Sequence, residues 1–400
     1  MKTLDDFDFE GKVAIVRVDF NSPIDPETKR ILDDYRIRAH SKTIRELSKK
    51  GARVVVLSHQ GRPGRPDFIS LREHANLLGR FLGKEVGYTD DVFGAEAMRE
   101  ISKLKDGDVL VLGNVRKFEG EMESKSAEEH ARSELVRRLA PLADVFVLDA
   151  FSSAHRAHAS VIGFTAVLPS LAGRVMEKEL RALEAVLNDP KRPCIYILGG
   201  VKIEDSLKIL GRVFEEGVAD LVLTGGVFAN LILLAKGFEL GEPSMVEIRD
   251  GELLDEARRL VSSYPERLKV PIDVAVDAGG RVEMDVEELP SEYKIMDIGS
   301  RTIRLYSELI KGARSILFNG PVGVFEREEF GKGTREILKA IASSDAFSLV
   351  GGGHSLAAVK KYGLEKGISY LSTAGRALLA YLMEEELPGL KALERGGKSI

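Results

Sequence analysis

The chain has 400 residues, of which 44% are hydrophobic and 30% charged, and its formal net charge is -5. This composition is typical of a globular protein, and the length suits two domains of ordinary size. Acidic and basic residues are interspersed, which argues against non-specific binding to nucleic acid or to an anionic membrane.

The sequence gives no sign of a targeting or membrane-spanning segment. No apolar run reaches the ~18 residues that a membrane helix needs. The acidic N-terminal stretch MKTLDDFDFEGK lacks the apolar core of a signal peptide. Cys194 is the only cysteine, so no intrachain disulfide can form. We therefore expect a cytoplasmic protein.

Short apolar runs alternate with longer amphipathic stretches along the chain. In order, the runs occupy residues 13–20, 52–59, 108–115, 144–151, 193–200, 219–226, 270–276, 315–322, 345–353 and 368–375. They are rich in Val, Ile and Leu without alternation, which is typical of strands covered on both faces. Between them, patterns such as Leu71, Ala75, Leu78 and Leu82 place apolar residues on one helical stripe. Repeated βα units predict an α/β fold with parallel sheets.

The middle of the chain predicts a helical connection between two such domains. Residues 177–187 have a strongly helical pattern, and Pro190 and Pro193 break it. We therefore predict two doubly wound, Rossmann-like parallel-sheet domains that are joined by a helical hinge.

The strand ends of the first half are basic or polar. They carry Arg17, Asp19, Asn21, His59, Arg62, Arg65, Arg116, His155, Arg156 and His158, and Arg36 and Arg38 follow a turn. Ligands of open parallel sheets bind at the carboxyl ends of the strands. The planar fork of arginine suits carboxylate and phosphate. Any one of these arginines could be a solvated surface charge, but together they predict a site for a small anion with more than one negative charge.

The strand ends of the second half are rich in glycine instead. The segments are LGGVK (198–202), TGGV (224–227), FNGPVGVFE (318–326), VGGGHS (350–355) and STAG (372–375). Glycines between a strand and a helix let backbone N–H groups approach phosphate oxygens, although a single pair is more often a tight turn. Neither GxxxxGK[ST] nor GxGxxG occurs. The two halves together indicate phosphoryl transfer between a nucleotide and a small anion.

The motifs RVDFNSP, SHQGRPG, DAFSSAHRAH, LGGVK and FNGPVGVFE occur in this order. With them the chain resembles phosphoglycerate kinase over essentially its whole length, and its details resemble the archaeal branch of that family. The resemblance implies reversible phosphoryl transfer between ATP and the carboxylate of 3-phosphoglycerate in glycolysis and gluconeogenesis. It also implies Mg²⁺ bound with ATP or ADP, and in-line transfer in an interdomain cleft that closes around both substrates.

Domain boundaries follow from the resemblance and from the helical pattern in the middle. We expect an N-terminal phosphoglycerate-binding domain at 1–172, a hinge helix at 173–190 and a C-terminal nucleotide-binding domain at 191–377. Residues 378–400 would return to the N-terminal domain. The expected partners are the small-molecule substrates, with no nucleic acid and no membrane, and the chain would be a monomer or a homodimer.

The resemblance also assigns site residues. On the phosphoglycerate side it implies Asp19, Phe20, Asn21, Arg36, His59, Gln60, Gly61, Arg62, Arg116 and Arg156. On the nucleotide side it implies Gly199, Gly200, Lys202, Asn319, Pro321, Glu326, Gly352, Gly353, His354 and Ser355, with Gly375 and Arg376 as candidate phosphate contacts. Arg36 and Lys202 would be catalytic, Arg36 by neutralising charge at the moving phosphoryl group. No protein ligand of the metal is assigned.

The chemistry agrees with these residue types. A carboxylate nucleophile is ionised at neutral pH, since an α-carboxyl group has a pKa of about 3.5, so it needs no general base. The enzyme must instead hold two anions in line and neutralise charge in the transition state. We therefore expect His59, His155 and His158 to position or cap other groups rather than to transfer protons.

Three positions depart from the commonest pattern of the family. Ser206 stands where a second lysine is common, His354 replaces an aspartate expected near the metal, and Arg376 replaces a glycine. Imidazole is a poor ligand for Mg²⁺. Arg376 would either contact phosphate or point outward. These departures motivate an alternative, a catalytically weak nucleotide-binding or regulatory protein. A nicotinamide-dependent dehydrogenase is a further alternative that shares the fold class, but it would need the glycine fingerprint that is missing here.

Overall fold

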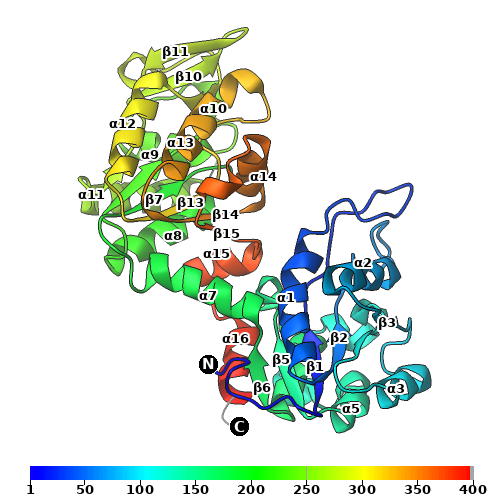
Figure 1. Cartoon of the computed structure of the whole chain (residues 1–400). Helices are drawn as coiled ribbons and strands as arrows, with labels where there is room; N and C mark the ends of the chain where they lie inside the picture. The colour runs from blue at the N-terminus through cyan, green and yellow to red at the C-terminus, as the bar shows by residue number, and fades with distance from the viewer. Residues whose placement is uncertain (249, 397–400) are drawn as a thin grey trace. The chain divides into compact units, whose positions relative to one another are not determined.

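The computed structural model describes residues 1–248 and 250–396. The chain divides into two compact units, Met1–Leu180 with Glu386–Ile400 and Arg181–Glu385. Figure 1 colours the chain from one end to the other. Of the C-terminal segment predicted at 378–400, residues 397–400 lie outside the described residues. No helix in the described part of the chain is long and apolar enough to cross a membrane.

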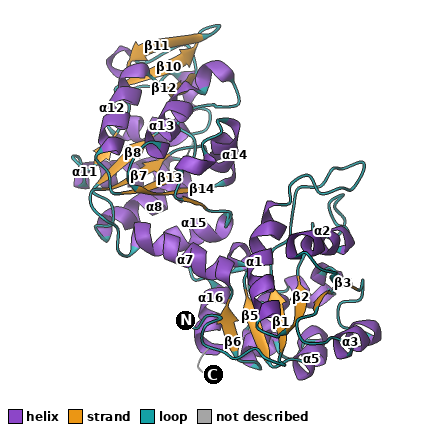
Figure 2. Ribbon diagram, viewed as in Figure 1, coloured by secondary structure: helices purple, strands orange, loops and turns teal. Residues whose placement is uncertain are grey.

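The first unit is a parallel six-stranded sheet covered by helices (Figures 1 and 2). Its strand order is β3-β4-β2-β1-β5-β6. The strands are β1 (Val13–Arg17), β2 (Arg53–Leu57), β3 (Gly87–Tyr88), β4 (Val109–Val111), β5 (Val145–Leu148) and β6 (Ser170–Ala172). The helices are α1 (Tyr35–Lys49), α2 (Arg72–Leu82), α3 (Ala95–Ser102), α4 (Ala127–His130), α5 (Glu134–Leu139), α6 (Ala159–Ile162) and α16 (Pro388–Gly396). Short 3₁₀ turns join several of them.

Both faces of this sheet are buried, as the non-alternating apolar runs predict. On one face Val16 of β1 and Val147 of β5 pack with Ile44 of α1 in a fully buried cluster. Neighbouring strand residues point the other way. On the opposite face the ring of Phe146 stacks on Phe164 at 5.2 Å between centroids.

The second unit repeats this architecture. Its parallel sheet has the order β15-β14-β13-β7-β8-β9. The strands are β7 (Cys194–Leu198), β8 (Leu221–Thr224), β9 (Leu268–Lys269), β13 (Ser315–Asn319), β14 (Phe347–Gly351) and β15 (Tyr370–Leu371). The helices are α8 (Ile203–Glu215), α9 (Gly226–Ala235), α10 (Glu242–Met245), α11 (Gly251–Ser263), α12 (Ser300–Lys311), α13 (Lys332–Ala342), α14 (Gly353–Lys361) and α15 (Arg376–Leu382). Helix α7 (Arg174–Leu187) contains the point at which the chain passes from one unit to the other.

A small antiparallel sheet accompanies the second unit. Strands β10 (Asp273–Asp277), β11 (Arg281–Asp285) and β12 (Ile295–Ile298) lie in the order β11-β10-β12. The apolar run 270–276 does form a strand, but its placement in a parallel sheet was wrong. Gly279 and Gly280 have positive φ angles of 83° and 153°, which lets the chain reverse directly into a hairpin. A parallel neighbour would have required a crossover helix.

Each parallel sheet has one point where its strand order reverses. In the first unit β1 lies between β2 and β5, and in the second β7 lies between β8 and β13. Crevices at such switch points are where open α/β sheets bind ligands. The motifs RVDFN and LGGVK follow β1 and β7. The predicted fold class, two parallel-sheet α/β domains, is confirmed.

Candidate active site

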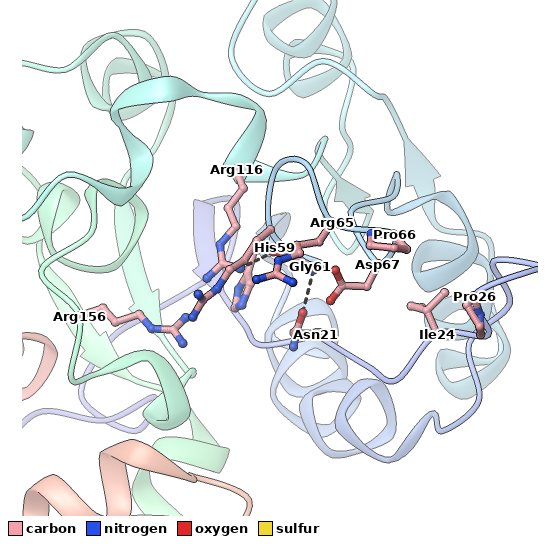
Figure 3. Close-up of a pocket in the computed structure, with 11 residues that line it drawn as sticks. Asn21, Ile24, Pro26, His59, Gly61, Arg65, Pro66, Asp67, Arg116 and Arg156 are labelled. Atoms are coloured by element: carbon pink, nitrogen blue, oxygen red, sulfur yellow. Dashed lines mark hydrogen bonds between the residues drawn. The ribbon is translucent and has the colours of Figure 1, made fainter.

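A cavity of about 610 Å³ opens at the strand ends of the first unit (Figure 3). It is lined by Asn21, Ile24, Pro26, His59, Gly61, Arg62, Arg65, Pro66, Asp67, Arg116 and Arg156. The structure thus brings together six predicted substrate residues from four separate segments. In Figure 3 the side chains of Arg116 and Arg156 both extend toward His59. The lining residues Ile24, Pro26, Pro66 and Asp67 were not predicted, because nothing in their residue types suggests anion binding.

Positive charge is crowded around this cavity. Burial, and then the neighbouring Arg156 and Arg17, lower the pKa of Arg116 to about 10. The pKa of Arg156 is also lowered, mainly by burial and by Arg62 and Arg36, although Asp19 opposes this. Like charges held this close repel one another until an anion lies among them. The charge of the lining therefore suits a multiply charged anion.

The loop after β2 depends on Gly61. Its φ is +64°, and a Cβ atom there would lie 2.3 Å from the backbone oxygen of Asp67. The N–H of Gly61 donates to Oδ1 of Asn21 at 2.8 Å, and its carbonyl accepts from the guanidinium of Arg116. Three predicted substrate residues thus hold one another in place through a backbone that only glycine permits.

Arg36, from the first turn of α1, forms an ion pair with Asp19 just after β1. Burial alone would raise the pKa of Asp19, but Arg36, Ser152 and Arg17 outweigh it and hold that pKa well below its usual range. Ser152 donates a hydrogen bond to the same carboxylate oxygen. Asp19 is therefore ionised and orients Arg36. Ser152 was missed because a lone serine after a strand carries no signal by itself.

Phe20 and Gln60 lie in the same segments but are fully buried. The ring of Phe20 stacks on His74. The amide of Gln60 accepts from the N–H of Ser22 at 2.9 Å and donates to the carbonyl of Asp67 at 3.2 Å. Both residues therefore support the cavity from behind and expose no atom to it.

His59 and His158 are held neutral. Burial lowers the pKa of His59 well below its usual value, and Nδ1 of His59 faces the guanidinium of Arg17 at 3.0 Å. Burial and then Arg156 lower the pKa of His158 to about 3. Because a guanidinium can only donate, Nδ1 of His59 accepts and its proton lies on Nε2. The Nε2 of His155 faces Nε of Arg156 at 3.2 Å.

Arg17 is one of the basic strand-end residues, but the resemblance did not assign it to the site; the structure places it beside His59. It is 1% exposed. Its Nε donates to Oγ of Ser160 at 2.7 Å, and Ser160 in turn donates through its N–H and Oγ to the buried carboxyl group of Glu121. This network lies behind His59. Only the fold reveals it, because its members are far apart in the sequence.

In the second unit, hydrogen bonds join three of the glycine-rich strand ends. The N–H of Gly199 donates to the carbonyl of Asn319 at 3.0 Å, and that of Gly200 to the carbonyl of Pro321 at 2.8 Å. The N–H of Gly320 donates to Oγ of Ser355 at 2.9 Å. A Cβ atom on Gly320 would lie 2.2 Å from the backbone oxygen of Gly199. These glycines therefore let two loops cross closely. Several of their N–H groups donate to the protein itself and not to a ligand.

The start of α14 offers N–H groups of a different kind. Gly352 caps the helix with a φ of +88°, and Gly353 and His354 are exposed while Ser355 is buried. The first N–H groups of a helix have no partner within the helix, and they attract anions. This terminus lies beside Asn319, whose Oδ1 would be 3.0 Å from a Cβ atom on Gly352.

An apolar cavity of about 120 Å³ adjoins Gly200. Most of its lining is apolar or glycine: Gly200, Val201, Gly226, Val227, Ala229, Pro271, Val274, Ile295, Met296, Ile298, Val322, Gly323 and Val324. Asn230, Glu247, Lys294 and Asp297 complete the lining. Apart from Gly200, none of these was a predicted site residue, because apolar residues near strand ends look like core. Such a slot between two glycine turns suits a flat aromatic ring.

The remaining predicted nucleotide residues are exposed. Lys202 caps α8, and Glu326 follows β13 in an exposed turn. Arg376, next to Gly375, pairs with Asp205 and Glu385, both at 3.2 Å. Ser206 is buried on α8. Lys208, two residues further along the helix, pairs with Glu204 at 2.8 Å.

The side chains at the strand ends of the second unit do not form a metal centre held by the protein alone. In the described part of the chain no three His, Cys, Asp or Glu side chains come together as a metal site. Mg²⁺ prefers oxygen ligands and commonly takes them from substrate phosphates and water. The residues present thus fit a metal that arrives with a nucleotide, and no protein ligand is assigned to it.

The fold, with basic strand ends in one unit and glycine-rich strand ends in the other, is that of a two-domain α/β phosphotransferase. The model of the family described as "Phosphoglycerate kinase" matches residues 4–385. The chain belongs to the phosphoglycerate kinase family and transfers a phosphoryl group between ATP and the carboxyl group of 3-phosphoglycerate. The resemblance inferred from the sequence is confirmed, including its archaeal character.

Curated relatives and solved structures agree over the full length. The chain is 47% identical to the phosphoglycerate kinase of Methanothermobacter thermautotrophicus over 98% of this chain and 96% of that protein. It is 44% identical to that of Thermococcus kodakarensis over 98% and 97%. The crystal structure of phosphoglycerate kinase from Pyrococcus horikoshii is 43% identical, covers all of both chains and has a TM-score of 0.88.

Proposed function

We propose that the 610 Å³ cavity binds phosphoglycerate and that Arg62, Arg116 and Arg156 hold its phosphate group. The observation that carries this proposal is the convergence of these arginines, together with Arg65, on one cavity whose described lining includes a single acid, Asp67. The buried Asp19 nearby is already paired with Arg36. The unbalanced positive charge requires a ligand with at least two negative charges. Phosphoglycerate supplies both a phosphate and a carboxylate.

Arg36 acts at the carboxylate end of the substrate and neutralises charge on the moving phosphoryl group. Asp19 and Ser152 fix the guanidinium in the orientation for this task. Asn21 and Gly61 shape the wall of the cavity, and Phe20 and Gln60 support that wall from behind. Because His59 and His158 are neutral and the nucleophile is already ionised, no residue acts as a general base.

The nucleotide binds at the switch point of the second unit. Its base enters the 120 Å³ apolar cavity beside Gly200, and Pro321 and Glu326 lie toward the ribose. The phosphates face the start of α14 at Gly352, Gly353, His354 and Ser355, with Lys202 and Asn319 near the transferring group. Gly375 and Arg376 lie at the edge of this region, and Arg376 reaches a phosphate only by leaving one of its two carboxylate partners.

Magnesium is carried by the nucleotide phosphates and, when bound, offsets their negative charge. His354 does not ligate it, because an imidazole is a poor partner for Mg²⁺. His354 instead contributes a backbone N–H at the helix start. The single buried cysteine and the substrates suit a reducing cytoplasm, and we propose that location.

A coupled assay with 3-phosphoglycerate, ATP and Mg²⁺ tests this proposal against the regulatory alternative that Ser206, His354 and Arg376 motivate. We expect turnover that depends on all three components. Tight nucleotide binding without turnover over a wide range of temperature would favour the alternative.

A further inference from the structure

A buried pair, His40 and Asp149, lies behind the proposed phosphoglycerate site without touching the cavity. The side chain of His40 is 5% exposed and that of Asp149 is 0% exposed. Nδ1 of His40 lies 2.8 Å from Oδ2 of Asp149. Two buried polar groups of this kind are retained only when all their hydrogen bonds are made, so the partners of the pair are informative.

On one side, His40 contacts the substrate segment. The backbone N–H of Asp19 donates to Nε2 of His40 at 3.2 Å. A backbone N–H can only donate, so Nε2 carries a lone pair and the ring proton lies on Nδ1. His40 therefore donates from Nδ1 to Asp149 while it accepts at Nε2 from Asp19, and both ring nitrogens are used.

On the other side, Asp149 contacts the start of α7. Its Oδ1 accepts from the backbone N–H of Val175 at 2.8 Å and faces that of Met176 at 3.4 Å. These are N–H groups of the first helical turn, which have no partner within the helix. A carboxylate at this end also complements the helix dipole. Asp149 thus caps the helix in which the chain leaves the first unit.

Helix α1 carries the whole connection on one face. Arg36, His40, Thr43 and Glu46 are spaced by four, three and three residues, so they share one side of the helix. Arg36 pairs with Asp19, and Thr43 accepts from the N–H of Arg174 at 3.1 Å. Glu46 pairs with the guanidinium of Arg174 at 2.6 Å. This stripe runs from a proposed substrate residue to the first turn of α7.

We propose that His40 is a positioning residue that couples phosphoglycerate binding to the first turn of α7 through Asp149. The inference rests on the proposed role of Asp19 and Arg36. A ligand that holds the Asp19 segment in place also holds His40, because His40 accepts from the N–H of Asp19. His40 in turn holds Asp149, which strengthens the hydrogen bonds of Asp149 to Val175 and Met176. The coupling is reciprocal, so a weakened cap lowers the affinity for phosphoglycerate.

Two substitutions separate the two ends of His40. In His40→Gln the amide oxygen can take the place of Nε2 and accept from Asp19, but nothing donates to Asp149. In His40→Asn the amide nitrogen can donate to Asp149 but does not reach Asp19. Each variant breaks one link, so we expect KM for 3-phosphoglycerate to rise by about 3–10-fold in both, as for one net hydrogen bond. The value of kcat and KM for ATP should stay unchanged.

The decisive readout is residue-resolved amide hydrogen exchange of the full chain with and without 3-phosphoglycerate. We expect the ligand to slow exchange at Val175 and Met176 in the wild type and to lose this effect in both His40 variants. Thr43→Val is the matched control: it should speed exchange at Arg174 in both states and keep the ligand effect at Val175 and Met176.

The outcomes are distinguishable. Calorimetry of the wild type first establishes that 3-phosphoglycerate binds, and failure there would overturn the proposed site and the coupling with it. Binding without slower exchange at Val175 and Met176 would overturn the coupling alone. So would full protection in His40→Gln and His40→Asn. The wild-type result keeps the proposal falsifiable even if a His40 variant does not fold.

Discussion

Arg36 at the start of α1 is paired with Asp19 at the end of β1, and Ser152 after β5 bonds to the same carboxylate oxygen. Strands β5 and β1 are neighbours in the sheet. The pair therefore joins the switch point of the first unit to the helix that covers it. The buried Asp19 holds Arg36 in one orientation but does not neutralise the other arginines of the cavity.

Arg36→Ala should lower kcat by roughly 10²–10³-fold, by analogy with the loss of one donor to a developing charge. ATP affinity should not change, because Arg36 lies in the first unit. Arg36→Lys is the control for the fold: it keeps a charge against Asp19 but loses the planar fork, so turnover should still fall. Steady-state kinetics and calorimetry measure both effects. An equal loss of ATP affinity would place Arg36 on the nucleotide side.

Arg156→Ala should weaken 3-phosphoglycerate binding by about 10–100-fold, the range of one charge-assisted hydrogen bond. Burial makes this contact strong, and removal of one cation also relieves repulsion on Arg116, which moderates the loss. Arg137, exposed on α5, provides a matched control, because Arg137→Ala removes the same charge away from the cavity. Calorimetry in low salt measures the affinities. Similar losses in both variants would mean that only net charge matters.

Gly320→Ala should disrupt the nucleotide half-site. A Cβ atom would lie 2.2 Å from the oxygen of Gly199, and the φ of +91° is unfavourable for alanine. We expect ADP affinity to fall sharply and 3-phosphoglycerate affinity to persist. Gly211→Ala on α8 is the opposite case, because a Cβ atom there meets nothing within 4 Å. The free energy of unfolding should rise by about 0.5–1 kcal/mol. Unchanged ADP binding in Gly320→Ala would contradict the crossing-loop account.

The positions of the sites were predictable, whereas their internal contacts were not. Apolar runs without alternation gave the buried parallel strands, and the residues after β1 and β7 gave the two half-sites. The role of many glycines could not be predicted from the sequence. Whether the N–H of a glycine faces a phosphate or another loop depends on which loops cross in the folded protein. The partners of Arg17 and the roles of Glu121, His40 and Asp149 were missed for a related reason, because buried polar partners meet only after the sheet and α1 have packed.

The antiparallel sheet of β10 to β12 shows the same limit. The run 270–276 has the composition of a buried parallel strand, and β10 is indeed buried. What decides its sheet is the glycine turn at 279–280, which sends the exposed strand β11 back along it.

His74 should make the protein less stable in acid. Burial lowers its pKa from 6.5 to about 4. Its Nε2 bonds to Oε1 of Gln60 at 3.1 Å, and its buried Nδ1 has no hydrogen-bond partner among the described residues. The unfolded chain therefore binds the proton more tightly, so stability is complete above pH 6.5 and falls as pH drops toward 4. The loss is about 3 kcal/mol.

His74→Gln can keep the donor to Gln60 and removes the titration. Denaturant midpoints measured from pH 4 to 7 should slope less in this variant than in the wild type. Parallel slopes in the two proteins would show that another group controls the acid sensitivity.

The central claim is that the first unit binds phosphoglycerate and the second binds the nucleotide. A crystal structure of the protein with 3-phosphoglycerate and ADP tests this claim most directly. We expect the phosphate of 3-phosphoglycerate among Arg62, Arg116 and Arg156, and the base of ADP in the cavity beside Gly200 with its phosphates at the start of α14. Phosphoglycerate bound at the glycine-rich strand ends, or ADP phosphates bound among the three arginines, would contradict the account.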